Sequence, residues 1–131
     1  MARTEPIVCP FTARTAPPHQ AYLGIPYARP PLGPLRFAPP QPAAAWTATR
    51  NATAFGDACL QDSRGLLASM YGPQSEDCLT INVFVPPRVS SSGGTGGLHV
   101  MVWIYGGRFW SGATQGTAYD SRFLANQTGA V

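Results

Sequence analysis

Residues 79–85 read LTINVFV, and every odd-numbered position in this stretch carries an aliphatic side chain. A period of two is that of a β-strand, and the prolines at 86 and 87 end it because proline has no backbone N–H to donate. After a flexible connector at 90–97, SSSGGTGG, residues 98–105 read LHVMVWIY. Such a nearly continuous apolar run is typical of a strand buried on both faces, in the middle of an α/β sheet. We therefore predict an antiparallel pair, 79–85 and 98–105, at the start of a larger sheet.

The rest of the chain contains fewer regular elements. Nine prolines between positions 17 and 42 predict irregular, extended backbone with one short strand near 21–24. Residues 119–126 predict a short helix that begins at Asp120 or Ser121. Residues 1–20 are expected to be an atypical or disordered segment. The remaining residues, 21–131, are expected to form the domain.

Composition excludes several classes of protein. The 131 residues include nine arginines and no lysine, with a net charge of +3, and the arginines are scattered singly. Nucleic-acid binding is therefore not expected. No apolar window reaches the roughly 18 residues of a membrane-spanning helix. The three cysteines lack the CxxC spacing of a zinc site, so a structural metal is not expected. No cofactor is expected either.

No complete catalytic set is present in the sequence. None of the eight serines stands in a Gly-x-Ser-x-Gly pattern, which exposes the nucleophile of α/β serine hydrolases. Glu76 and Asp77 are the one pair of neighbouring carboxylates. Adjacent side chains on extended backbone point apart, so a salt bridge or a turn fits this pair better than acid–base catalysis.

The strongest local motif follows the second apolar run. Residues 103–112 read WIYGGRFWSG, so a predicted strand passes directly into Gly106 and Gly107. Consecutive glycines let the backbone turn tightly and direct N–H groups into a cavity, which is the arrangement of an oxyanion hole. A glycine hairpin, a β-bulge or a phosphate-cradling loop would have the same local pattern. A P-loop is excluded because no Gly-Lys-Ser/Thr follows.

The order of several motifs resembles the cholinesterase and type-B carboxylesterase family of α/β-hydrolases over roughly residues 22–131. The matching stretches are YLGIPYA at 22–28, PPLG at 30–33, LRF at 35–37, SEDCLTINV at 75–83 and VWIYGG at 102–107. The resemblance implies an α/β fold, namely an N-terminal fragment of an α/β-hydrolase with a mixed sheet and long irregular loops. It also implies a small carboxylic ester as the substrate of the parent protein.

The resemblance assigns roles to individual residues. It places Gly106, Gly107 and Arg108 at the oxyanion-loop positions, Cys59 and Cys78 in a disulfide, and Arg36 and Glu76 in a structural salt bridge. The third oxyanion position is normally glycine in the family. Arg108 either moves its side chain aside and keeps a working N–H donor, or blocks and remodels the site. Choline selectivity is not expected, because the disulfide loop lacks the family's tryptophan.

The triad serine, acid and histidine of the family all lie downstream of this segment, so this chain alone is predicted to be inactive. The alternatives are a catalytically dead, cholinesterase-like adhesion module that binds a partner protein, and a truncated product without function. The sequons at Asn51 and Asn126, together with a disulfide, favour a secreted glycoprotein, although residues 1–10 show no signal peptide.

Overall fold

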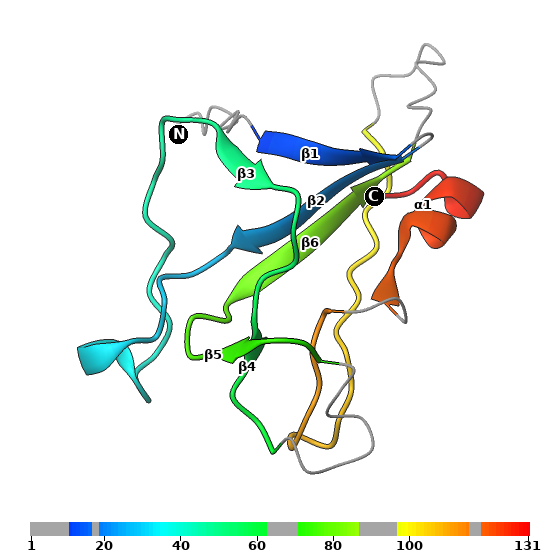
Figure 1. The fold of residues 1–131 in the computed structure, drawn as a ribbon. Helices are drawn as coiled ribbons and strands as arrows, with labels where there is room; N and C mark the ends of the chain where they lie inside the picture. The colour runs from blue at the N-terminus through cyan, green and yellow to red at the C-terminus, as the bar shows by residue number, and fades with distance from the viewer. Residues whose placement is uncertain (1–10, 17–18, 63–70, 87–96, 116–118) are drawn as a thin grey trace, which may run out of the picture.

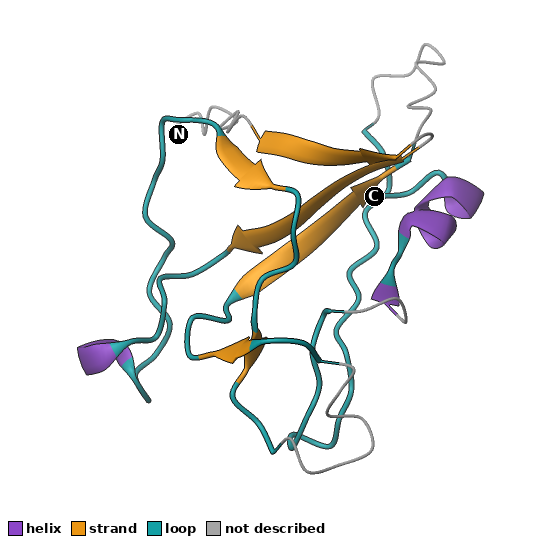
Figure 2. Cartoon of the chain, in the orientation of Figure 1, coloured by secondary structure: helices purple, strands orange, loops and turns teal. Residues whose placement is uncertain are grey.

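The computed structural model describes residues 11–16, 19–62, 71–86, 97–115 and 119–131. Its main feature is a four-stranded sheet of order β3-β1-β2-β6 (Figure 1). The strands are β1 (Phe11–Ala16), β2 (His19–Pro26), β3 (Arg50–Ala52) and β6 (Thr80–Val85). β1 pairs with β2 antiparallel and with β3 parallel, and β6 closes the other side of β2 antiparallel. The fold is thus a mixed sheet joined by long loops (Figure 2).

The strand predicted at 79–85 is confirmed as β6, and the short strand predicted near 21–24 is confirmed as the longer β2. The register between them shifts between Tyr22 and Ile25. Gly24 lies at this irregularity with φ +66°. Its N–H, which the shift removes from the ladder, donates to Oδ1 of Asn82 on β6 at 3.0 Å. The side chain of one strand therefore replaces a missing ladder bond of the other.

The predicted pairing of 79–85 with 98–105 is wrong, because β6 pairs with β2 instead. Residues 98–105 also form no strand and are not buried: Val102 is 76% exposed and Ile104 83%. Their backbone is extended. Within the described residues, however, it forms backbone hydrogen bonds to only one other residue, Val131. The Val131 N–H donates to the carbonyl of His99 at 2.9 Å, and Met101 N–H donates to the Val131 carbonyl at 2.7 Å. A strand needs a row of such partners, and one residue supplies a single parallel bridge.

Ordered structure begins earlier than predicted. β1 covers 11–16 and β2 starts at His19, so strands occupy part of the segment 1–20 that we expected to be atypical or disordered. Residues 1–10 lie outside the described part of the chain. β1 and β2 pair with Ala16 opposite His19, so β1 lies between β3 and β2, the strand that carries the first family-like motif.

The predicted short helix is confirmed as α1 (Arg122–Thr128), displaced by about three residues. Ser121 occupies the N-cap position, but the capping bond comes from Asp120, whose Oδ1 accepts the Arg122 N–H at 3.1 Å. Asp120 also binds the Arg122 guanidinium, and this hydrogen bond raises the pKa of Arg122. Gly129, at φ +68°, ends the helix in the left-handed conformation that favours glycine.

A second, two-stranded sheet lies beside the main one. β4 (Ala58–Cys59) and β5 (Gln74–Ser75) pair in parallel, and a 3₁₀ turn, η1 (Gly33–Leu35), lies within the proline-rich stretch. No helix among the described residues is long and apolar enough to cross a membrane.

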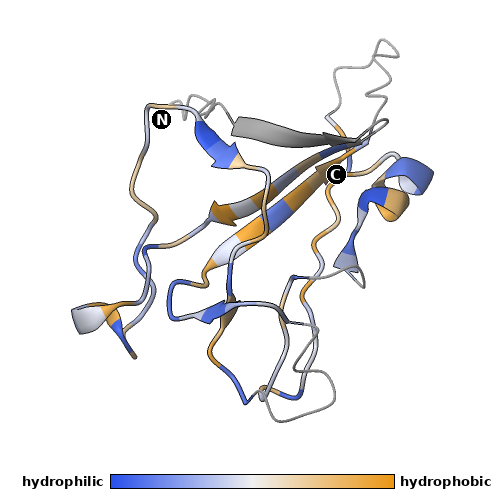
Figure 3. Cartoon of the chain, in the orientation of Figure 1, coloured by the Kyte–Doolittle hydropathy of each residue, from blue (hydrophilic) through white to orange (hydrophobic). Residues whose placement is uncertain are grey.

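Small side chains make up the core of the described structure. The buried apolar residues are Ala21, Leu23, Ala28, Ala52, Ala58, Ala113, Ala125 and Ala130. Among the described residues no large side chain is completely buried. Val100, Trp103 and Trp110 are 70%, 68% and 73% exposed. Figure 3 shows this apolar character along segment 98–105. Because alanine buries little apolar area, this core contributes little free energy on folding.

Candidate functional site

The glycine turn predicted after the second apolar run forms a tight left-handed loop. Gly107 has φ +142°, and the next two residues, Arg108 and Phe109, have φ +57° and +58°. The carbonyl of Gly107 accepts two bonds, from Trp110 N–H at 2.9 Å and from Ser111 N–H at 3.1 Å. These bonds turn the Gly107 carbonyl toward the inside of the loop.

The N–H groups of the predicted oxyanion positions are free. Within the part of the chain that the structure describes, Gly106, Gly107 and Arg108 donate no hydrogen bond from their amides. Three successive unpaired N–H groups at one turn can bind an anionic or strongly polar oxygen. Within the described residues, these three amides are therefore available to an acceptor from outside the loop.

Position 107 must be glycine, because neighbouring backbone lies too close to leave room for a side chain. A Cβ built on Gly107 would lie 1.6 Å from the carbonyl oxygen of Ser111, whereas one on Gly106 would meet nothing within 4 Å. The two non-glycine residues that follow hold positive φ angles, which cost about 1–3 kcal/mol each. Both residues are exposed.

The disulfide predicted from the resemblance is present. Cys59 and Cys78 are bonded, with Cα atoms 5.0 Å apart. The bond joins the second strand residue of β4 to the segment that leads into β6. It closes a loop in which Gln61, two residues after Cys59, contacts the glycine turn.

Sequence reasoning missed Gln61. Its side-chain amide binds both backbone groups of Gly112: Nε2 donates to the carbonyl at 2.9 Å, and Oε1 accepts the N–H at 2.8 Å. This contact connects the disulfide loop to the end of the glycine turn, 51 residues away in sequence. Nothing local in the sequence marks Gln61, since a lone glutamine is common on protein surfaces.

The predicted salt bridge between Arg36 and Glu76 is also present, with Nε and Oε1 2.6 Å apart. It is not buried: the side chains are 51% and 33% exposed. Solvent screens the pair, and exposed pairs of this kind contribute about 0.2–1 kcal/mol.

We predict that Glu76→Gln lowers the free energy of unfolding by less than about 1 kcal/mol. The amide keeps the shape of the side chain and removes only its charge. Denaturant unfolding at low ionic strength measures the difference, which should shrink further in 1 M salt because salt screens exposed charges. A loss of several kcal/mol that is independent of salt would contradict this prediction.

The two predicted glycosylation sites are exposed. Asn51 lies on β3, and its Oδ1 accepts bonds from the N–H and the hydroxyl of Thr53 at 3.1 and 2.6 Å. Asn126 lies on the exposed part of α1.

No cluster of three or more His, Cys, Asp or Glu side chains that could hold a metal occurs within the described ranges.

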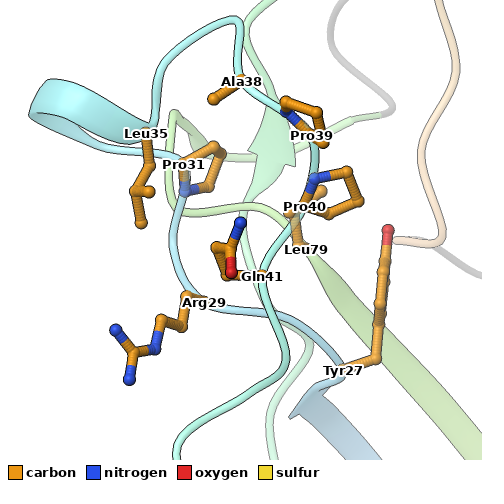
Figure 4. Close-up of a pocket in the computed structure, with 9 residues that line it drawn as sticks. All are labelled: Tyr27, Arg29, Pro31, Leu35, Ala38, Pro39, Pro40, Gln41 and Leu79. Carbon is orange, nitrogen blue, oxygen red and sulfur yellow. The ribbon is translucent and has the colours of Figure 1, made fainter.

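The structure also contains a cavity of about 290 Å³ away from the glycine turn. The proline-rich stretch and the residue before β6 line it, among them Tyr27, Arg29, Gln41 and Leu79 (Figure 4). None of the residues that line it belongs to 106–112. The structure therefore brings the glycine turn together with the disulfide loop, but does not place it at this cavity.

Comparison with known proteins supports the resemblance. The sequence model of the carboxylesterase family matches residues 11–131. Acetylcholinesterase 1 of Caenorhabditis briggsae is 38% identical over 127 residues, which cover 91% of this chain and 20% of that protein. Among solved structures, a thermophilic PNB esterase superposes with a TM-score of 0.80 at 40% identity, covering 92% of this chain and 24% of its own. A second PNB esterase structure gives 0.75 at 41%, covering 89% and 22%.

The chain thus spans between a fifth and a quarter of the length of these relatives. At this identity and TM-score the described fold corresponds to the N-terminal region of the PNB esterase, which is part of an α/β-hydrolase fold. The glycine turn, the disulfide and the mixed sheet are features of one continuous match over residues 11–131, and the chain belongs to the carboxylesterase family.

Proposed function

We propose that this chain supplies the oxyanion loop of a serine carboxylesterase that acts on small carboxylic esters. The observation that carries the proposal is the row of N–H groups at Gly106, Gly107 and Arg108, which have no acceptor among the described residues. In ester hydrolysis a nucleophile attacks the carbonyl carbon, and the carbonyl oxygen becomes an anion in the tetrahedral intermediate. Donors held about 2.7–3.1 Å from that oxygen stabilise it without having to reorganise.

The backbone around Gly107 favours this role. Its carbonyl is occupied by the amides of Trp110 and Ser111, so the loop keeps its shape without using the N–H groups of Gly107 and Arg108. A donor that is already fixed in place lowers the barrier more than one that must first release another partner. The nucleophile, the acid and the histidine would come from other parts of the complete enzyme.

Arg108 is the point at which this loop departs from the family pattern. The substitution leaves the backbone N–H in place, and the side chain is exposed. A cation at this position changes the entrance to the acyl site, and with it the esters that fit. Its presence also favours the second candidate function, a cholinesterase-like binding module without catalysis.

A hybrid enzyme tests the proposal. This chain, whole, replaces the matching N-terminal quarter of the thermophilic PNB esterase, and hydrolysis of p-nitrophenyl acetate is followed by absorbance. We expect the hybrid to hydrolyse the ester and to be inactivated by a serine-directed phosphonate. We expect the 131-residue chain alone to show neither a burst nor steady turnover, because its sequence has no Gly-x-Ser-x-Gly nucleophile.

The variant Arg108→Gly distinguishes the two candidate functions. A hybrid that is inactive with Arg108 and active with glycine would support the non-catalytic module, because the arginine alone would then prevent catalysis. A folded hybrid that is inactive with either residue would overturn the oxyanion role of this loop. Circular dichroism and the thermal midpoint establish folding in each case.

We further propose an extracellular location for the complete protein. The Cys59–Cys78 disulfide is the supporting observation, since such bonds persist in oxidising compartments. The exposed sequon at Asn51 fits the same compartment.

A further inference from the structure

Gln61 binds Gly112 as a neighbouring β-strand would. In an antiparallel sheet, two hydrogen-bonded residues exchange both N–H···O bonds. Here the side-chain amide of Gln61 forms that pair of bonds with Gly112, at 2.9 and 2.8 Å. A single side chain therefore holds both backbone groups of the residue that ends the glycine turn.

The orientation of this amide is determined by its other partners. Nε2 also donates to the carbonyl of Cys59 at 3.1 Å, so both of its protons are used. A flipped amide would set Nε2 against the N–H of Gly112, donor against donor. The backbone N–H of Gln61 is in turn held by Oε1 of Gln74 at 2.9 Å. The disulfide at Cys59 and the β4–β5 pair thus fix Gln61 from both sides.

Gly112 passes this constraint on to the proposed oxyanion donors. A Cβ on Gly112 would lie 2.5 Å from the ring of Tyr105 and 2.7 Å from the carbonyl oxygen of Gly106. The carbonyl oxygen of Ser111 lies closest to the position that a Cβ would take on Gly107. Residues 111–112 therefore pack directly on Gly106 and Gly107, and a shift of Gly112 moves their amides.

We propose that Gln61 is a positioning residue for the oxyanion loop: through Gly112 it sets where the Gly107 and Arg108 N–H groups point. The inference rests on the proposed esterase function of that loop. It makes Gln61 part of the apparatus that aligns the donors, although its own side chain is bound to Gly112 and Cys59 and not to the ester.

The first test is hydrogen exchange on the full 131-residue chain, read at residues 106–112 by mass spectrometry. Gln61→Leu removes both bonds, and we expect exchange at Gly112 to rise at least tenfold relative to the unmodified chain. The matched control is Gln115→Leu, which removes an amide bound to Gly56 and Pro73 but not to the turn. Exchange at Gly112 in this control should stay within twofold.

The variant Gln61→Glu adds a readout in pH. An ionised glutamate accepts the Gly112 N–H but repels its carbonyl, whereas a protonated one can donate to that carbonyl as Gln61 does. In Gln61→Glu, protection from hydrogen exchange at 106–112 is expressed as a ratio to that of the unmodified chain at the same pH. This ratio should be low at pH 7. It should recover below the ordinary glutamate pKa of about 4.3. Gln61→Leu should not recover, and equal behaviour of the two variants would overturn the bidentate contact.

The second test uses the hybrid esterase. Gln61→Leu is expected to lower kcat roughly tenfold, which is the usual energetic effect of losing one to two hydrogen bonds. KM should change little, because the donors act on the transition state and not on the bound substrate. If exchange rises but kcat does not fall, the positioning role is wrong. If the unmodified hybrid has no activity, the proposed function fails. The hydrogen-exchange experiment on the 131-residue chain then still decides whether Gln61 holds the turn.

Discussion

Replacement of Gly107 by alanine is expected to lower ester hydrolysis by the hybrid enzyme roughly 100- to 1,000-fold, the loss measured when one oxyanion donor is removed. The new Cβ would lie 1.6 Å from the carbonyl oxygen of Ser111. The backbone angle, φ +142°, is one that side-chain-bearing residues rarely adopt. The turn must open to admit the methyl group, and the N–H groups of Gly107 and Arg108 then move away from the position of the developing anion.

The measurement is kcat with p-nitrophenyl acetate, with KM determined in parallel. Gly106→Ala serves as the folding control, because its Cβ would meet nothing within 4 Å. Its thermal midpoint should match that of the unmodified hybrid. Gly97→Ala controls for substitution outside the turn, since Gly97 is also in open space. A Gly107→Ala hybrid that keeps full kcat would show that this turn does not set the oxyanion donors.

Loss of the Cys59–Cys78 disulfide is the second large effect that we expect. The bond closes a loop with a sequence separation of 19 residues. Without it the unfolded chain gains conformational freedom, and the chain-entropy estimate for a loop of this length is about 3 kcal/mol. The paired substitution Cys59→Ala with Cys78→Ala should lower the free energy of unfolding by that amount, measured by urea denaturation of the hybrid.

Activity should fall along with stability in this variant, because the loop carries Gln61. Cys9→Ala is the matched control: it removes a cysteine that takes no part in this disulfide and should leave both quantities unchanged. A double variant as stable as the unmodified hybrid would show that the folded sheet holds the loop without the bond.

Local pattern was sufficient for some of the elements. The alternation at 79–85 predicted β6, and the polar residues before 122 predicted α1, because both elements follow from the side-chain period and the capping of a few consecutive residues. The order of family-like motifs then predicted two contacts that are distant in sequence, Cys59 with Cys78 and Arg36 with Glu76. The exposure of the second pair could not be predicted, since it depends on what covers the two side chains.

The sequence by itself determined which segments are extended and which one turns at Gly106 and Gly107. Only the tertiary structure decided their neighbours: β6 lies against β2, residues 98–105 bond to Val131, and Gln61 binds Gly112. The physical reason is that side-chain periodicity encodes the faces of a strand, whereas hydrogen-bond partners at its edges come from distant parts of the chain. For the same reason the free amides of the glycine turn are a property of the fold, although the two glycines that permit the turn are plain in the sequence.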